Sequence, residues 1–339
     1  MRGAHRRPDG RRSLVAHPTA VPPPHESRTQ ARRGTQGAPR VGPGVRAGPA
    51  PQNALRRFPP RCTRRAKRGN DAVSHSIEDR ETHWRTPVTQ YTCLANARNP
   101  ALIIYLLDIS GSMQSPMGTT TRHAALNDAL NSSIGALIKR SARGEFVSRR
   151  YDVAVFAYSD TVRDVLGGKI SVADLADMDE LQIPEPGGNT NTEAAFRAAH
   201  DFLSSVLANY QDCPAPLVCH ITDGEWNVGD PLPFARALRD MTVADGNVLI
   251  ENVFIGDSFT RTPITNPRAW TGVRSAGELV TPFAQKLFEL SSTFPAPWAL
   301  QLENDMAYQI AADARMLVPA SNTALLELAL AMSQATPTR

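Results

Sequence analysis

The stretch ALIIYLLDISGS, residues 101–112, decides the fold. Its first seven residues form an uninterrupted apolar run, which is typical of a strand buried on both faces of a parallel sheet. Polar residues follow at once, and Asp108, Ser110 and Ser112 are spaced two apart. In an extended turn this spacing points the three side chains to one side, and Gly111 permits a tight backbone path. The stretch therefore predicts a central strand that ends in a cluster of oxygen atoms.

Outward from this strand, apolar β-type runs alternate with segments of helical periodicity. We expect further strands at 151–159, 216–223 and 247–256, and a short antiparallel edge strand within 161–168. We expect helices at roughly 120–143, 191–210, 231–241, 277–292 and 321–334. This alternation predicts an α/β fold with a doubly wound, mostly parallel, Rossmann-like sheet that binds ligands beyond the carboxyl ends of its strands.

The first 90 residues differ sharply in composition from the rest of the chain. They hold 19 Lys and Arg against 6 Asp and Glu, a net charge of +13, whereas residues 91–339 hold 18 against 27, a net charge of −9. They also hold 12 of the 27 prolines. Such a segment buries too little apolar surface to offset the entropy of ordering it. We therefore expect residues 1–95 to be a disordered arm rich in Arg, Pro and Gly, and residues 98–336 to form one domain.

Three interpretations of this arm stand side by side. The basic run at 56–68 predicts weak electrostatic binding to nucleic acid or to an acidic partner, although no nucleic-acid-binding motif accompanies it. The arm is otherwise a solvated extension, or upstream sequence translated ahead of a native start near Val88.

Cysteine usage and hydropathy bear on the compartment. Four cysteines in 339 residues make no disulfide framework, and no pair has the CxxC spacing of a zinc site. No apolar run approaches the ~18 residues that a membrane span needs. The apolar stretch after the basic start is interrupted by His17 and Pro18, so it is a poor export signal. These features favour a cytoplasmic protein with no membrane partner.

Two more polar clusters fall at the same predicted edge of the sheet. One is the loop GGNTNT, residues 187–192, which enters a helix, and the other is Thr222-Asp223-Gly224-Glu225, directly after a strand. With the first cluster they offer two carboxylates and three hydroxyls, and no Cys or His. Such hard oxygen ligands suit Mg²⁺ or Mn²⁺ better than Zn²⁺.

Three motifs carry a resemblance to the von Willebrand factor A domain family. LLDISGSM, residues 106–113, resembles the family's D-x-S-x-S motif, GGNTNTEAA resembles its threonine loop, and ITDGEWNVGDPL resembles its T-D-G loop. The resemblance covers about 98–260 well and continues more loosely to about 335. It implies a metal-ion-dependent adhesion site, in which an acidic residue of a bound protein completes the coordination. The positions that match the family's metal ligands are Asp108, Ser110, Ser112, Thr190 and Asp223.

Several neighbouring residues have less definite roles. Thr192 competes for the threonine position, but Thr190 directly follows the glycine loop, whereas Thr192 suits the helix start. Glu225 either orients water near the ion or is a solvated loop carboxylate. Trp226 and Met113 either form an apolar rim for a partner or serve packing. The remaining candidates are expected to be structural: Asp257, Cys219, His123, His200 and His220.

The resemblance implies a protein-binding module and not an enzyme. The chain looks most similar to stand-alone bacterial members, including those of tellurium-resistance and stress-associated gene clusters, which act as cytoplasmic scaffolds beside kinase, phosphatase or ATPase partners. One alternative is a subunit that assists an ATPase or chelatase complex. The other is a metal-assisted hydrolase, which the sequence disfavours because no Lys or His lies in the three loops and Ser110 stands where phosphatases of this fold carry a second Asp.

Overall fold

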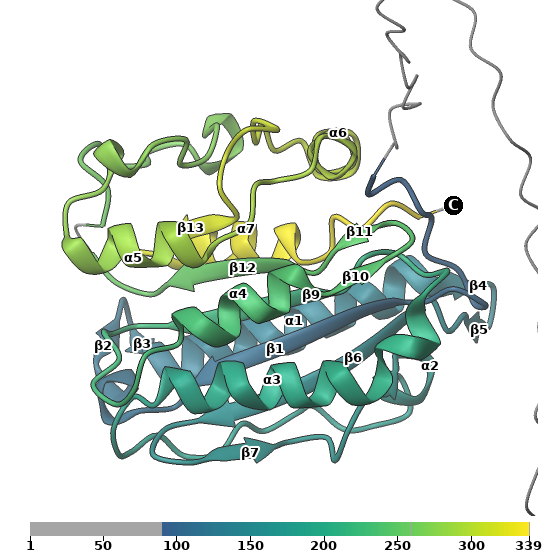
Figure 1. Cartoon of the computed structure of the whole chain (residues 1–339), viewed down its shortest axis with the longest axis horizontal. Helices are drawn as coiled ribbons and strands as arrows, with labels where there is room; N and C mark the ends of the chain where they lie inside the picture. Colours follow the sequence, from purple (N-terminus) through teal and green to yellow (C-terminus); the bar gives the residue numbers. More distant parts are fainter. Residues whose placement is uncertain (1–89, 258, 339) are drawn as a thin grey trace, which may run out of the picture. The chain divides into compact units, whose positions relative to one another are not determined.

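A single sheet organises the part of the protein that the computed structural model describes, residues 90–257 and 259–338. The strand order is β13-β12-β9-β1-β6-β7, and β8 also pairs with β6 (Figure 1). The strands are β1 (Ala101–Asp108), β6 (Tyr151–Tyr158), β7 (Val162–Asp164), β8 (Ile170–Ser171), β9 (Leu217–Thr222), β12 (Leu249–Phe254) and β13 (Leu317–Pro319). Within this sheet, β7 and β8 each pair antiparallel with β6, and the other strand pairs are parallel. The predicted mostly parallel sheet with an antiparallel edge is therefore confirmed.

Helices cover both faces of this sheet. One face packs against α1 (Arg122–Ser141), α2 (Val172–Leu175), α6 (Ala296–Met306) and α7 (Thr323–Met332). The other face packs against α3 (Thr192–Val206), α4 (Leu232–Asp240) and α5 (Pro282–Leu290). Figure 1 shows α3 and α4 in front of the sheet and α1 behind it. Short 3-10 turns complete the helices: η1 (Gly111–Gln114), η2 (Leu207–Tyr210), η3 (Pro267–Ala269) and η4 (Ala276–Glu278).

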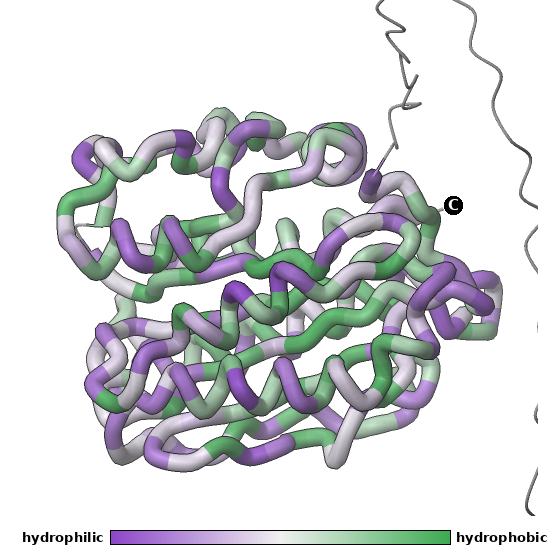
Figure 2. The backbone as a smooth tube through the Cα atoms, viewed as in Figure 1, coloured by the Kyte–Doolittle hydropathy of each residue, from purple (hydrophilic) through white to green (hydrophobic). Residues whose placement is uncertain are grey.

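The continuous apolar run of β1 follows from these two layers. Successive side chains of a strand point to opposite faces. Ile103, Tyr105 and Leu107 accordingly join the core under α1 and α7, whereas the intervening residues join the core under α3 and α4. Figure 2 shows the strongly hydrophobic course of β1 through the middle of the molecule. Every residue of β1 is buried, as is typical of a central parallel strand.

Side-chain caps start the helices that flank the sheet's carboxyl edge. Thr121 accepts a hydrogen bond from the Ala124 amide at the start of α1, and Asn191 accepts one from Ala194 at the start of α3. Asn322 accepts a hydrogen bond from the Leu325 amide at the start of α7. These caps fix where the loops at this edge end and the helices begin.

Several elements were not expected from the sequence. They include the helices α2 and α6 and the strand β8. They also include three hairpins of two-residue strands: β2 (Pro116–Met117) with β3 (Thr120–Thr121), β4 (Ala142–Arg143) with β5 (Phe146–Val147), and β10 (Thr242–Val243) with β11 (Gly246–Asn247). The β2–β3 hairpin takes the place of the first residues of the helix expected from 120. Strands this short carry no alternation that a pattern can reveal.

Residues 1–89 of the predicted arm, which include the possible start near Val88, lie outside the described residues. The last five residues of the predicted arm, 91–95, are attached to the fold. The Tyr91 amide donates to the Asp245 carbonyl, and the Ala95 amide donates to the Pro337 carbonyl. No helix in the described part of the chain combines the length and hydropathy needed to cross a membrane.

Candidate functional site

The site begins with the Asp108 carboxylate at the carboxyl end of β1. Its Oδ1 accepts a hydrogen bond from the Ser110 amide at 2.8 Å, and its Oδ2 accepts one from the Thr222 hydroxyl at 2.6 Å. Thr222 ends β9, the strand that pairs with β1. Two neighbouring strands therefore supply both the buried carboxylate and its donors.

Burial governs the acidity of this group. It raises the pKa of Asp108 to about 6, while the hydrogen bonds from Thr222 and Ser110 act in the opposite direction. The neighbouring Asp223 carboxylate raises the pKa of Asp108 further. Two carboxylates of like charge thus lie near one another at one edge of the sheet, an arrangement that a cation would stabilise.

A chain of hydroxyl groups joins these two carboxylates. The Ser110 and Ser112 hydroxyl oxygens are 3.1 Å apart, and Ser112 Oγ donates to Asp223 Oδ1 at 2.6 Å. Asp223 follows β9 directly and is buried. The structure therefore brings four of the five sequence-predicted ligands, Asp108, Ser110, Ser112 and Asp223, into one hydrogen-bonded group.

The loop that carries Thr190 is fastened to both other loops. The Gly111 amide donates to the Gly188 carbonyl at 3.1 Å, and the Gly187 amide donates to the Ile109 carbonyl at 2.8 Å. Thr190 itself is buried, and its amide donates to Asn227 Oδ1 in the loop after β9. Thr190 is thereby held between the first and third clusters.

Gly188 makes the close approach of this loop possible. Its φ of 79° is in the left-handed region, where glycine is favoured. A Cβ at this position would lie 2.1 Å from Asp160 Oδ2, so a larger residue would also collide. The same Asp160 carboxylate accepts hydrogen bonds from the amide and the side chain of Asn189.

Thr192 lies in a different environment. It is the first residue of α3, and its hydroxyl is 3.4 Å from the Tyr158 hydroxyl in the core. Tyr158 in turn is 2.7 Å from His220 Nε2, and burial lowers the pKa of His220 to about 4. Thr192 is therefore part of a buried polar group beneath the sheet edge.

The remaining candidates are distributed around the site or away from it. Glu225 and Asp257 are exposed, Met113 is fully buried, and Trp226 packs edge-on against Phe283 of α5 with 5.3 Å between ring centroids. Met113 and Trp226 therefore both take part in packing. The other residues expected to be structural are placed as follows: Cys219 is buried, His123 Nε2 is 2.9 Å from the Pro184 carbonyl, and His200 contacts Asp201.

Sequence reasoning named Thr222 only as a member of the third cluster and gave it no role, and it missed Arg122. In the structure Thr222 donates to Asp108, and Arg122 Nη1 is 2.7 Å from Asp223 Oδ2. Arg122 is the first residue of α1. A positive side chain in the first turn of a helix opposes the helix dipole, and this was the available signal that Arg122 has a specific anionic partner.

The donor set fits a hard divalent ion. Within residues 90–257 and 259–338, no group of three or more His, Cys, Asp and Glu is placed to hold a metal. The site instead combines two carboxylates with serine and threonine hydroxyls, which are the oxygen ligands that suit Mg²⁺ and Mn²⁺. The residues that would hold such an ion are Asp108, Ser110, Ser112, Thr190 and Asp223.

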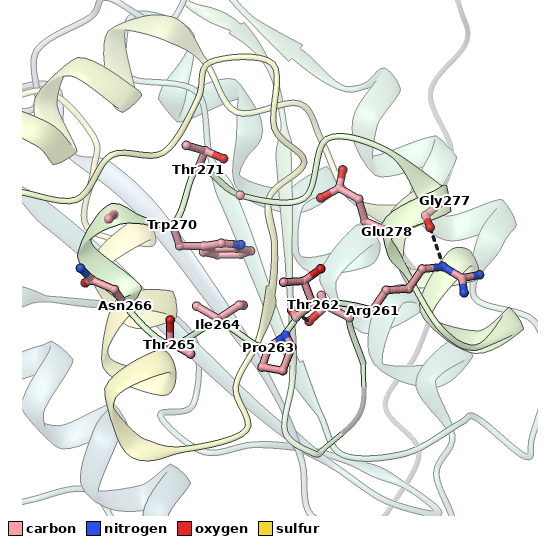
Figure 3. Close-up of a pocket in the computed structure, with 13 residues that line it drawn as sticks. Arg261, Thr262, Pro263, Ile264, Thr265, Asn266, Trp270, Thr271, Gly277 and Glu278 are labelled. Atoms are coloured by element: carbon pink, nitrogen blue, oxygen red, sulfur yellow. Dashed lines mark hydrogen bonds between the residues drawn. The ribbon is translucent and has the colours of Figure 1, made fainter.

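A pocket of about 530 Å³ lies in the segment 260–278, and none of the five candidate ligands lines it. Figure 3 shows Trp270 and Ile264 on its wall together with Arg261 and Glu278. Arg261 Nε donates to the Gly277 carbonyl at 2.8 Å, which joins two sides of the pocket. The pocket and the carboxylate site therefore have separate linings.

One family of known proteins matches part of this chain. Residues 103–225 match the family described as von Willebrand factor type A domain, and this match includes all five candidate ligands. No match was found among the curated proteins.

Several solved structures also match parts of this chain. Proximal thread matrix protein 1 from the mussel byssus, in a form with a zinc-occupied MIDAS motif, is 21% identical, with a TM-score of 0.36, over 47% of this chain and 39% of that one. A von Willebrand factor type A protein from Catenulispora acidiphila is 19% identical, with a TM-score of 0.33, over 50% and 39%. An aerotolerance-related membrane protein from Bacteroides fragilis is 14% identical, with a TM-score of 0.35, over 69% and 99%. The chain thus spans about two fifths of the first two proteins.

Proposed function

Because residues 103–225 match the family described as von Willebrand factor type A domain, we propose that this protein is a metal-dependent protein-binding module. In this proposal Asp108, Ser110, Ser112, Thr190 and Asp223 hold Mg²⁺ or Mn²⁺, and an acidic residue of a partner protein completes the coordination. The single observation that supports it most is the hydrogen-bonded group that links Asp108 to Asp223 through Ser110 and Ser112.

The chemistry of the donors explains why a partner's acid would bind. An ion held largely by neutral hydroxyls keeps much of its positive charge. A carboxylate from outside then gains a charge-assisted bond in a site that is partly shielded from water. In this scheme the hydroxyl-bearing loops set the strength of partner binding, and Glu225 orients water around the ion.

The position of the two threonines supports Thr190 as the ligand. Thr190 lies in the loop that contacts both other clusters, whereas the Thr192 hydroxyl lies beside Tyr158 in the core. We therefore assign Thr190 to the ion and Thr192 to the start of α3.

A binding role is also favoured over catalysis. The loops 108–114, 187–192 and 222–230 contain no Lys or His that would act as an acid, a base or a phosphate clamp. Arg122, a cationic side chain that reaches the site, is paired with Asp223. A metal-assisted hydrolase therefore remains the less favoured alternative.

The proposal also includes a cellular role for the protein. We place the protein in the bacterial cytoplasm as a scaffold in a signalling or stress-response system of the tellurium-resistance type, with a kinase, phosphatase or ATPase as partner. This placement depends on the sequence resemblance and on cysteine usage. The alternative that shares the fold is a subunit that assists an ATPase or chelatase complex.

Affinity capture with the full chain tests the proposal. Wild type, Asp108→Ala and the control Asp257→Ala are used as baits in cell extract, each with Mg²⁺ or with a chelator. Asp257 is an exposed acid that follows β12 and takes no part in the hydrogen-bonded group. We expect one set of partners to be retained by wild type and Asp257→Ala in Mg²⁺ alone. Identical sets under all conditions would contradict the proposal.

A further inference from the structure

Arg122 is delivered to the site by a local turn of the chain. The β2–β3 hairpin lies between η1 and α1, and the Arg122 amide donates to the Ser115 carbonyl at 3.0 Å across its base. The Arg122 guanidinium thereby reaches Asp223, with Nη1 2.7 Å from Oδ2. The Asp223 side chain is fully buried, and 23% of the Arg122 side chain is exposed.

The position of Arg122 on α1 is electrostatically unfavourable for the helix itself. The amino end of a helix carries a partial positive charge, so a cation there is repelled. The other basic side chains near an end of α1, Lys139 and Arg140, lie in its last turn, where the dipole favours them. The interaction that favours Arg122 at this position is therefore its contact with the buried Asp223 carboxylate.

Both oxygens of Asp223 have a donor from the protein. Ser112 Oγ donates to Oδ1 at 2.6 Å, and Arg122 donates to Oδ2 at 2.7 Å. A guanidinium keeps its proton at any physiological pH. A divalent ion drawn to Asp108 and Asp223 would therefore meet a permanent positive charge that already neutralises one of the two carboxylates.

We propose that Arg122 is a built-in counter-cation of Asp223 that competes with the divalent ion and so sets the affinity of the site for metal. This inference depends on the proposed function, because it assigns a role in the same site. It predicts that Arg122 stabilises the metal-free protein and weakens the binding of metal. Without metal, Arg122 stabilises the fold by neutralising a buried carboxylate. With metal, its charge repels the ion and its hydrogen bond must be given up or shared.

Mn²⁺ titration calorimetry and thermal melting in chelator test this inference on the full chain. The variants are Arg122→Gln, the charge-preserving Arg122→Lys and the control Lys139→Gln. Lys139 is exposed and lies 17 residues further along α1, about 25 Å from Arg122 at the helical rise. The Lys139→Gln substitution therefore removes one positive charge at a position far from the site.

We expect Arg122→Gln to bind Mn²⁺ at least about tenfold more tightly than wild type and to melt at a lower temperature in chelator. Arg122→Lys should resemble wild type in both measurements, since it retains the charge, and Lys139→Gln should also do so. If Arg122→Gln is unfolded in chelator, we expect Mn²⁺ to restore its fold.

Three results would refute the inference, and they can be told apart. If wild type binds Mn²⁺ and Arg122→Gln binds it equally or more weakly, or is not refolded by it, the competition is refuted and the metal site stands. If neither wild type nor Arg122→Gln binds Mn²⁺, the proposed function fails and the competition fails with it. If Arg122→Lys behaves like Arg122→Gln, the charge of Arg122 is not the cause, and the inference is again refuted.

Discussion

Two buried carboxyl groups in the same sheet have opposite surroundings. Asp108, at the carboxyl end of β1, receives hydrogen bonds from Thr222 and from the Ser110 amide. Glu251, in the middle of β12, is fully buried beside Cys219 of β9. Among residues 90–257 and 259–338, no N–H or O–H group donates to either of its oxygens, and the Cys219 thiol is only a weak donor beside them. The comparison teaches that burial alone does not mark a binding site, whereas burial with converging donors does.

The physical difference lies in how the surroundings of each carboxyl group affect its charged form. An isolated carboxylate in an apolar core is strongly disfavoured, so the group stays protonated. Burial raises the pKa of Glu251 to about 8, and the Cys219 thiol lowers it by less. Burial raises the pKa of Asp108 only to about 6, because its donors favour the charged form. At neutral pH Asp108 is therefore mainly a carboxylate and Glu251 mainly a neutral acid.

The largest expected effect is the pH dependence of stability that Glu251 imposes. Between the unfolded pKa of 4.5 and the folded pKa of about 8, the unfolded chain releases a proton that the folded protein keeps. The free energy of unfolding should therefore fall as pH rises through this window, by up to about 5 kcal/mol. Urea unfolding at pH 5, 7 and 9 in chelator measures it.

Glu251→Gln is the matched variant for this measurement, because it keeps the shape and cannot ionise. We expect its stability to fall less steeply with pH than that of wild type, with the difference growing toward pH 9. Parallel pH profiles for the two proteins would show that Glu251 is not held as a neutral acid.

The next effect concerns metal affinity and separates the two acids directly. Asp108→Asn removes a charged ligand from the site, and we expect Mn²⁺ affinity to fall by about 100-fold or more, equivalent to about 2.7 kcal/mol. Glu251→Gln leaves the donors of the site in place, so its affinity should stay within about twofold of wild type. Calorimetry at one pH gives both values. Equal losses in the two variants would remove the distinction between the acids.

A smaller effect is expected when Asp108 is made to resemble Glu251. Thr222→Val removes the hydroxyl that donates to Asp108 Oδ2 and keeps the side-chain shape. Leaving this buried oxygen without its donor should cost about 1–3 kcal/mol of stability in chelator. Thr192→Val is the control, since the Thr192 hydroxyl is 3.4 Å from an uncharged partner, Tyr158, and should cost less. A Thr222→Val protein as stable as wild type would contradict the role given to this donor.

The smallest effect distinguishes the two threonines at the site's edge. Thr190→Val should weaken Mn²⁺ binding by about tenfold, or about 1.4 kcal/mol, because one neutral ligand is lost. Thr192→Val should leave Mn²⁺ affinity unchanged. The same calorimetric titration decides between them, and the reverse result would move the ligand role to Thr192.

Much of the sheet could be read from the sequence because central strands are marked by continuous apolar runs. The bounds of β1, β6, β9 and β12 all lie within two residues of the expected ranges. The two-residue hairpins were missed because such short pairs carry no period. The helix α6 was missed as well, although its 11 residues make it longer than α4, α5 and α7, which were predicted. Local pattern therefore recovers the central strands and most helices and loses the shortest strands.

The convergence of the loops that carry the candidate ligands was predictable for a related reason. The order of strands in a parallel sheet places the ends of β1 and β9 side by side, so residues 111 positions apart, Ser112 and Asp223, meet. The partner of Arg122 was not predictable, because the approach of its guanidinium to Asp223 depends on the β2–β3 hairpin. Glu251 was not either, because the stretch NVLIENVFIG does not reveal whether its carboxyl group has a donor.

An anomalous-scattering map of crystals grown with Mn²⁺ tests the central claim most directly. The account predicts one strong peak bounded by the side chains of Asp108, Ser110, Ser112, Thr190 and Asp223, absent from Asp108→Asn crystals grown in the same way. A peak at any other place, or an unoccupied group of these five side chains at a Mn²⁺ concentration that saturates the protein in solution, would contradict it.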